Sequence, residues 1–253
     1  MSGEYLNAPG LSKFNQQVVL SAWARSLGLE ETVLHEANER IGSSERFDVA
    51  AENELAGWEP ETATFVQLFN ISILYAPQWF LEAAQDVPNE VLALETTMLT
   101  IGYEAQARSH GEEAIFYAED IPFYDDAQLN VSTSCRQARL LARACPPDDV
   151  VTMPLEALDY YFTVAAFAEH AEPIAGAGYD VFSATVGQLA VLVAAAQRTK
   201  GFGTFMLARA AEECMFDGLI PQWITAVGDE VGEKMAAEVG FLLSGFRTSV
   251  TLA

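Results

Sequence analysis

The sequence is short of positive charge. Thirteen Lys and Arg residues stand against 36 Asp and Glu residues, which gives the 253-residue chain a formal net charge of -23. Nucleic acids and anionic lipid surfaces are bound by basic protein surfaces, so this composition argues against both as partners. The acidity itself is that of a solvated surface and selects no substrate.

Residues for metal and redox chemistry are also scarce. The three cysteines, Cys135, Cys145 and Cys214, have no metal-type spacing, and their odd number makes a poor disulfide framework. The three histidines stand alone in the sequence. We therefore expect no metal site.

Long apolar runs are missing as well. No run approaches the roughly 20 residues that a membrane span needs. The N-terminal residues lack a basic stretch followed by an apolar core, which is the pattern of a signal peptide. We expect a cytoplasmic protein without a membrane partner, either a monomer or a homodimer. A hydrophobic content of 51% is enough to build a sizeable core.

The sequence divides into two halves near residue 110, where the pattern of predicted helices and strands changes. We expect residues 1–110 to form a helical and β-hairpin region, which is either a degenerate copy of the second half or a lid. Its hairpin joins Thr62–Phe69 to Ile71–Tyr75, and the acidic stretch 42–61 is predicted to be a loop.

Residues 111–253 are predicted to form the functional domain. Alternating patterns indicate a strand at Gln137–Leu141 and an antiparallel meander further on. A helix follows the meander, and strand, helix and strand complete the chain. The predicted elements, in order, are a helix from Pro146 through Tyr161, strands at Phe162–Phe167, Pro173–Phe182 and Gln188–Ala194, a helix at Thr204–Phe216, a strand at Leu219–Ala226, a helix at Asp229–Val239 and one or two strands in Phe241–Leu252.

One stretch of this half has no carboxylate at all. From Val181 to Ala211 the sequence contains no Asp or Glu, but it contains Arg198, Lys200 and Arg209. Within it an apolar run ends in a basic, glycine-containing turn, and a helical pattern follows directly. Backbone N–H groups at such a strand–turn–helix junction favour an anion, most naturally phosphate.

The turn has the spacing Arg198-x-x-Gly201-x-Gly203. We expect both glycines to let the backbone adopt positive φ and approach a ligand where a Cβ would collide. The Gly-Lys-Ser/Thr of a P-loop is absent, and so are the third glycine and the later acidic residue of a dinucleotide fold.

At these residues the chain resembles the GCN5-related N-acetyltransferases. Their acyl-CoA pyrophosphate loop reads Arg/Gln-x-x-Gly-x-Gly/Ala between the fourth strand and the third helix. The motif Gly218-Leu219-Ile220-Pro221-Gln222-Trp223 is similar to the Gly-Leu-x-Pro-x-Trp of one bacterial branch. The segment from Asp229 to Phe241 is similar to Asn-x-x-Ser-x-x-Leu-Ala-x-x-x-Gly-Phe. The likeness extends from about Tyr160 to the C-terminus.

The resemblance implies an α/β (α+β) fold with a mixed, mainly antiparallel sheet flanked by helices. It also implies transfer of an acetyl group from acetyl-CoA to an amine of a small-molecule or peptide acceptor. The backbone of Val191, Leu192 and Val193 would meet the pantetheine arm, and the Asp229 region would lie beside the thiol. The pyrophosphate would be held by Arg198, Thr199, Lys200, Gly201, Phe202, Gly203 and Thr204.

The sequence departs from the family where acid–base chemistry is expected. Well-known members carry a base Glu on the fourth strand, and the equivalent position here is about Gly187, next to Gln188. Ala236 stands where many members have a Tyr that acts as the general acid. A base could instead come from the N-terminal half, from a water relay or from one of several nearby residues, which are Glu156, Asp159, His170, Glu172 and Asp180.

Two main functions therefore remain open. The first is an acyl-CoA-dependent N-acyltransferase. The second is a non-catalytic acyl-CoA-binding protein that senses or scaffolds, and the missing Glu and Tyr favour it. A purely structural protein ranks third because it leaves the carboxylate-free, basic stretch Val181–Ala211 unexplained.

Overall fold

The protein is described from a computed structural model, which covers residues 10–252 except 41–44, 54, 123–128 and 168–170. The chain forms two compact units. The first unit extends to Phe116 and also includes two later segments, Ile224–Asp229 and the residues from Leu243 onward. The second unit contains Tyr117–Trp223 and Glu230–Leu242. The functional division expected after residue 110 stays a prediction.

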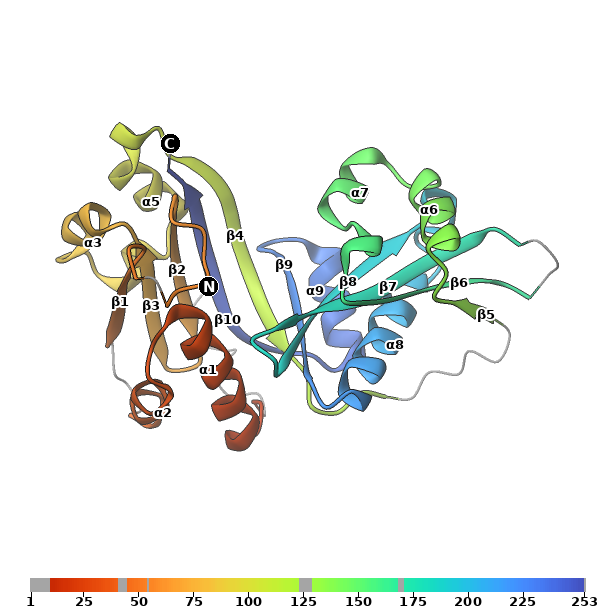
Figure 1. The fold of residues 1–253 in the computed structure, drawn as a ribbon, viewed down its shortest axis with the longest axis horizontal. Helices are drawn as coiled ribbons and strands as arrows, with labels where there is room; N and C mark the ends of the chain where they lie inside the picture. The colour runs from red at the N-terminus through yellow and green to blue at the C-terminus, as the bar shows by residue number, and fades with distance from the viewer. Residues whose placement is uncertain (1–9, 41–44, 54, 123–128, 168–170, 253) are drawn as a thin grey trace. The chain divides into compact units, whose positions relative to one another are not determined.

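The first unit combines a mixed sheet with short helices (Figure 1). Its strands lie in the order β1-β3-β2-β10-β4. Strand β2 is antiparallel to both β3 and β10, whereas β1 is parallel to β3. The elements are α1 (Lys13–Leu27), α2 (Glu31–Glu39), β1 (Arg46–Ala50), β2 (Thr62–Leu68), β3 (Ile71–Ala76), α3 (Gln78–Ala84), α4 (Asn89–Leu92), α5 (Glu95–Ile101), the 3₁₀ helix η2 (Tyr103–Ala105), β4 (Arg108–Tyr117) and β10 (Leu242–Thr251).

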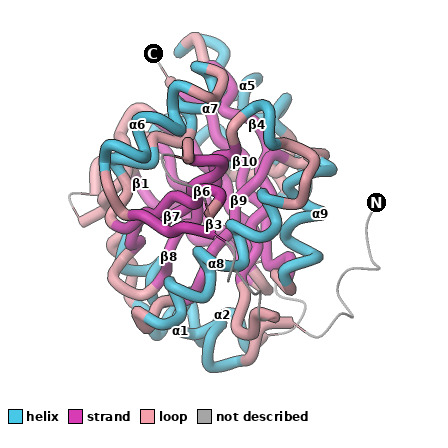
Figure 2. Tube along the Cα trace, turned by 90° about the vertical axis from the view of Figure 1, so that its right-hand side faces the viewer, coloured by secondary structure: helices cyan, strands magenta, loops and turns pink. Residues whose placement is uncertain are grey.

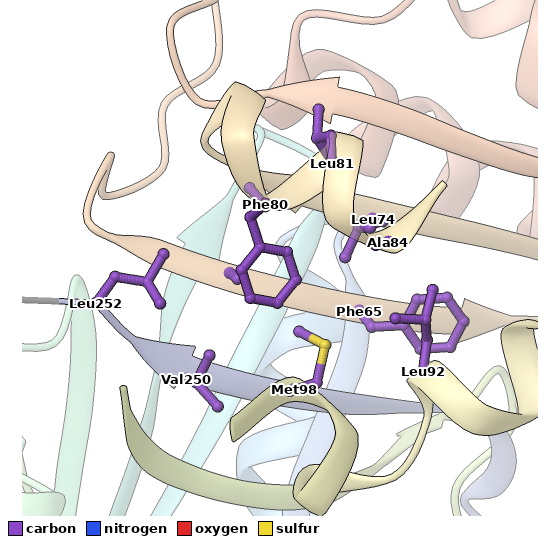
Figure 3. Close-up of a cluster of buried hydrophobic side chains, with 11 residues drawn as sticks. Phe65, Leu74, Phe80, Leu81, Ala84, Leu92, Met98, Val250 and Leu252 are labelled. Atoms are coloured by element: carbon purple, nitrogen blue, oxygen red, sulfur yellow. The ribbon is translucent and has the colours of Figure 1, made fainter. Parts of the chain in front are cut away.

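Local sequence signals explain several of these elements. The Ser12 hydroxyl accepts a hydrogen bond from the Asn15 amide at 3.4 Å and starts α1, and Gly28 ends this helix at φ 66°. The predicted hairpin is confirmed as β2 and β3. Phe80, Leu92 and Met98 from the following helices cover one face of the sheet and build a buried core with Phe65 and Val250 (Figure 3).

The second unit is an antiparallel meander with helices on both faces (Figures 1 and 2). Its strands lie in the order β9-β8-β7-β6-β5, and only the β8–β9 pairing among them is parallel. The predicted meander is confirmed as β6, β7 and β8. The elements are β5 (Leu129–Ser132), α6 (Cys135–Arg143), α7 (Pro147–Thr152), η3 (Leu155–Ala157), β6 (Tyr160–Ala166), β7 (Pro173–Phe182), β8 (Val186–Val193), η4 (Ala195–Gln197), α8 (Phe202–Phe216), β9 (Ile220–Ala226) and α9 (Glu230–Val239).

Three predicted elements are wrong. Gln137–Leu141 lies in helix α6, not in a strand, because the buried residues Ala138 and Leu141 are three apart and Ser134 caps the helix. The helix expected from Pro146 through Tyr161 stops at Thr152, and Pro154, which has no N–H to donate, follows. The expected loop 42–61 contains strand β1.

Alternate residues of β8 face opposite helices. Leu192 packs with Leu141 of α6 and Leu155 of η3. Gly187 faces the other way, toward Cys214 of α8. The strand therefore has an α6/α7 face and an α8 face, and it leads directly into the glycine turn. The predicted fold class, a mixed and mainly antiparallel sheet flanked by helices, is confirmed.

Candidate functional site

The candidate site begins where β8 ends. The parallel pairing of β8 with β9 joins Val186 to Ile220, Gly187 to Pro221 and Gln188 to Gln222. Strand β8 continues for five further residues, Leu189–Val193. Among the described pairings these residues are matched only with β7, so one edge of this stretch offers backbone groups to a ligand. The stretch includes Val191, Leu192 and Val193.

A tight turn connects this strand to α8. After the 3₁₀ turn at Ala195–Gln197, Arg198 is extended, Thr199 has φ 63° and Gly201 has φ 84°. Gly201 is the N-cap of α8, and an added Cβ there would meet nothing within 4 Å. A left-handed Thr costs about 1–2 kcal/mol, so Thr199 is held in a strained conformation. No sequence signal indicated that strain.

The two glycines of the turn serve different purposes. Gly201 adopts the positive φ that was expected of it. Gly203 does not, because α8 already begins at Phe202, two residues before the predicted start. An added Cβ at Gly203 would lie 3.0 Å from Met235 Sδ of α9. Gly203 is therefore explained by the close packing of α8 on α9, and the expectation of a positive φ there is wrong.

The first turn of α8 supplies backbone donors. The first i→i−4 hydrogen bond of the helix runs from the Phe205 amide to the Gly201 carbonyl, at 3.1 Å. The amides of Phe202, Gly203 and Thr204 precede it and have no helical acceptor. The helix dipole adds partial positive charge at this end. This donor set fits the oxygens of a phosphate or diphosphate group.

Two of the turn's polar side chains are held by carboxylates from other helices. Arg198 forms an ion pair with Asp149 of α7, and its Nε also donates to the Val193 carbonyl at 3.4 Å. The Thr204 hydroxyl donates to Glu238 Oε2 of α9 at 3.0 Å. The fold therefore brings two acids to a stretch that has none in its own sequence.

Lys200 bends back onto the turn. Its Nζ donates to the Ala196 carbonyl at 3.0 Å and to Gln197 Oε1 at 2.9 Å. Both acceptors are neutral, so the positive charge of the ammonium group is not cancelled by these contacts. The side chain is exposed, as are those of Arg198 and Thr199.

The last predicted binding residue, Asp229, lies in the first unit. Thr225 Oγ1 donates to its Oδ2 at 2.7 Å, and the Asp229 amide donates to the Ala226 carbonyl at 3.0 Å. These contacts close the turn between β9 and α9. The role of Asp229 beside a cofactor thiol stays a prediction.

The positions at which the family carries its acid and base hold no titratable group here. A side chain at Gly187 would run into Cys214 Sγ, and Ala236 is fully buried in α9. Burial raises the pKa of the Cys214 thiol to about 12, which keeps it protonated and unreactive. Gln188 lies on the opposite face of β8 and is exposed.

Three of the other candidate bases, Glu156, Asp159 and Asp180, have structural partners, and Glu172 is exposed. Glu156 pairs with Arg139 of α6 at 2.9 Å. Asp180 of β7 accepts a hydrogen bond from the Asp159 amide just before β6, and Asp159 accepts one from the Val181 amide of β7, so the two carboxylates link these neighbouring strands. His170 lies outside the described residues. Among the residues that the structure describes, no cluster of His, Cys, Asp or Glu could hold a metal ion, and no helix is long and apolar enough to span a membrane.

Comparisons with known proteins give matches only among solved structures. No family model and no curated protein matches the sequence. A GCN5-related N-acetyltransferase-like protein from Streptococcus suis is 14% identical over 96% of this chain and 100% of its own, with a TM-score of 0.49. A Drosophila protein is 10% identical over 99% of both chains, with a TM-score of 0.50. A GNAT-family acetyltransferase from Colwellia psychrerythraea is 12% identical over 58% of this chain, with a TM-score of 0.43, and only 57% of its own length is covered.

At 10–14% identity these likenesses concern the fold alone. The solved structures that this fold resembles include proteins of the GCN5-related N-acetyltransferase family, which is the family that the sequence resembles. The acyl donors and acceptor substrates of these neighbours are properties of those proteins and are not carried over to this chain.

Proposed function

We propose that the protein is an N-acyltransferase that binds acetyl-CoA at the β8–α8 turn and transfers the acetyl group to an amine. One observation carries the proposal. The edge of Leu189–Val193 that no described strand pairs with leads through Ala195–Gln197 into a basic turn, and the first amides of α8 follow it. An extended pantetheine arm needs the edge, and a diphosphate needs the turn.

In this proposal the residues of the chain bind and orient the donor. The backbone of Val191 and Val193 hydrogen-bonds the amides of the arm, as an added strand would. The amides of Phe202, Gly203 and Thr204 hold the diphosphate, and Arg198 and Lys200 supply charge. Acetyl-CoA, when bound, supplies an activated thioester. The amine nitrogen bonds to its carbonyl carbon as the carbon–sulfur bond breaks, and the amine proton is taken up by a base while the thiolate is protonated.

The alternative is a protein that binds acyl-CoA without turning it over. A specific observation favours it, because Gly187 and Ala236 leave no room for the family's acid and base. Incubation with acetyl-CoA and a panel of amines separates the two functions. Thiol release that depends on a particular amine supports the enzyme, and tight binding without release supports the sensor.

The binding site itself is tested at Gly201. Gly201→Asp and Gly201→Asn add side chains of the same shape into open space, and both residues tolerate a left-handed backbone better than most. The pair therefore differs chiefly in one negative charge beside the phosphates. We expect calorimetry to show acetyl-CoA binding that is at least about tenfold weaker for the Asp variant than for the Asn variant. Equal affinities, or no affinity in the parent protein, would remove the turn as the site.

A further inference from the structure

The carboxylates of Asp149 and Glu238 contact the two ends of the proposed phosphate turn. Asp149 comes from α7 and pairs with Arg198, the first residue of the turn. Glu238 comes from α9 and accepts the hydrogen bond of Thr204, at the helix end of the turn. The proposed function assigns the Arg198 side chain and the Thr204 amide to the ligand, and the Thr204 hydroxyl that Glu238 holds belongs to the same residue as that amide.

Both contacts are open to solvent and are therefore weak. The side chains of Arg198 and Asp149 are 44% and 36% exposed, and that of Glu238 is 47% exposed. Exposed ion pairs contribute little because water competes for both partners. Glu238 also has a second partner, Lys234, at 3.7 Å on the same helix. A phosphate with better geometry can replace either carboxylate at small cost.

We propose that Asp149 and Glu238 are specificity-determining residues of this turn. They occupy Arg198 and Thr204 and so act as internal competitors for the phosphate groups of a ligand. An anion binds only if its phosphates replace both carboxylates and overcome their charge. The turn therefore selects diphosphate ligands against single small anions. This inference rests on the proposed function for the location of the site, but not on acetyl-CoA as the particular ligand.

Displacement of Asp149 has a consequence for α7. This short helix is joined to the site by the Arg198–Asp149 pair, and the nearby Ala195 amide donates to the Ala144 carbonyl just after α6 at 3.0 Å. Phosphate binding releases the first of these two links and leaves the backbone link in place. The α6–α7 connection is thereby made more mobile when the turn is filled.

The test uses Asp149→Asn and Glu238→Gln, singly and together, with Asp148→Asn and Glu230→Gln as matched controls on the same two helices. The probes are acetyl-CoA, inorganic pyrophosphate and inorganic phosphate, titrated by calorimetry. We expect each site variant to bind pyrophosphate and acetyl-CoA about two- to fivefold more tightly, and the double variant to show the larger gain. We expect the controls to match the parent. The preference for pyrophosphate over phosphate shrinks in the double variant.

The outcomes separate this inference from the proposed function. If the parent binds acetyl-CoA and the variants bind no more tightly, the two carboxylates do not compete with the ligand and only this inference is overturned. If Asp149→Asn weakens binding, Asp149 positions Arg198 for the ligand instead. If the variants bind pyrophosphate but no form binds acetyl-CoA, the competition stands and the acyl-CoA assignment fails. If no variant binds any phosphate, both are overturned.

Discussion

The two ends of strand β8 differ in what surrounds them. At its start, which we call the packed end, Gly187 lies against Cys214 and the ring of Tyr179, and both of those side chains are almost fully buried. At its other end the strand continues into the phosphate turn, residues 198–204, where Arg198, Thr199, Lys200 and Gly201 are all exposed. One end is filled by side chains, and the other presents backbone donors and charge.

This difference bears on the function. In the resembling family the packed end corresponds to the position of a catalytic base, and here a side chain at that position has no space. The packing of α8 on the sheet therefore accounts for the glycine at position 187, because a larger side chain there would collide with Cys214. The phosphate turn needs mainly backbone geometry, which the glycine and the helix start provide. In the proposed function, donor binding and acid–base chemistry would therefore depend on opposite ends of β8.

The largest expected effect comes from placing a carboxylate at the packed end. Gly187→Glu forces a charged side chain against Cys214 Sγ and the Tyr179 ring, whose nearest atoms lie 3.5 Å from an added Cβ. Overpacking together with a buried charge should lower the free energy of unfolding by about 3–5 kcal/mol. Urea denaturation measures the loss.

A paired variant shows whether the cause is steric. Gly187→Ala alone should destabilise by about 1–3 kcal/mol, and adding Cys214→Ala should recover part of the loss. Parent-like stability of Gly187→Glu would mean that the packed end can open to hold a base, and the contrast between the two ends of β8 would break down.

A smaller effect is expected from the hydroxyl of Tyr179. This hydroxyl donates a hydrogen bond to Asp217, and the Tyr179 ring stacks on that of Tyr160 with centroids 5.1 Å apart. Tyr179→Phe should cost about 1–2 kcal/mol of unfolding free energy at neutral pH. Tyr161→Phe, on the neighbouring strand β6, is the matched control. An equal loss in both variants would show that the Asp217 contact contributes nothing specific.

The same side chain predicts a pH dependence. Burial, and then the hydrogen bond to Asp217, raise the pKa of Tyr179 above its ordinary value of about 10. Because the folded state binds this proton more tightly than the unfolded chain, its contribution is fully present below about pH 10 and is lost as the pH rises through the folded pKa. The stability of the parent should therefore fall more steeply above pH 10 than that of Tyr179→Phe. Parallel profiles for the two proteins would contradict this.

The sequence predicted those structural features that depend on residues close together in the chain. The hairpin, the meander and the turn at Gly201 all follow from local pattern and backbone freedom. It did not predict contacts between residues far apart in the chain. Asp149 and Glu238 lie 49 and 34 residues from their partners, so the stretch that is free of acids in sequence is not free of them in space.

The errors have local causes as well. The short span Gln137–Leu141 suits a strand as well as a helix by its apolar pattern alone. The burial of Ala138 and Leu141 and the Ser134 cap decide for the helix. Gly203 was explained by a ligand because the position of α9, which places Met235 against it, is not visible in the sequence. The strained Thr199 left no sequence signal at all.

The smallest expected effect is a difference in labelling rate among the three thiols. Cys214 lies at the packed end, so its reactivity, compared with that of the other two, reports on that end without a substitution. Cys135 is exposed, Cys145 is half-buried and Cys214 is fully buried. Burial raises the pKa of the Cys145 thiol and raises that of Cys214 to about 12, so the reactive thiolate is scarce at both. Iodoacetamide at pH 8, followed by mass spectrometry of peptides, should label Cys135 first, Cys145 more slowly and Cys214 only when the chain is denatured. Labelling of Cys214 as fast as that of Cys135 under native conditions would show that α8 separates from β8, and the space at Gly187 would then be available to a substrate after all.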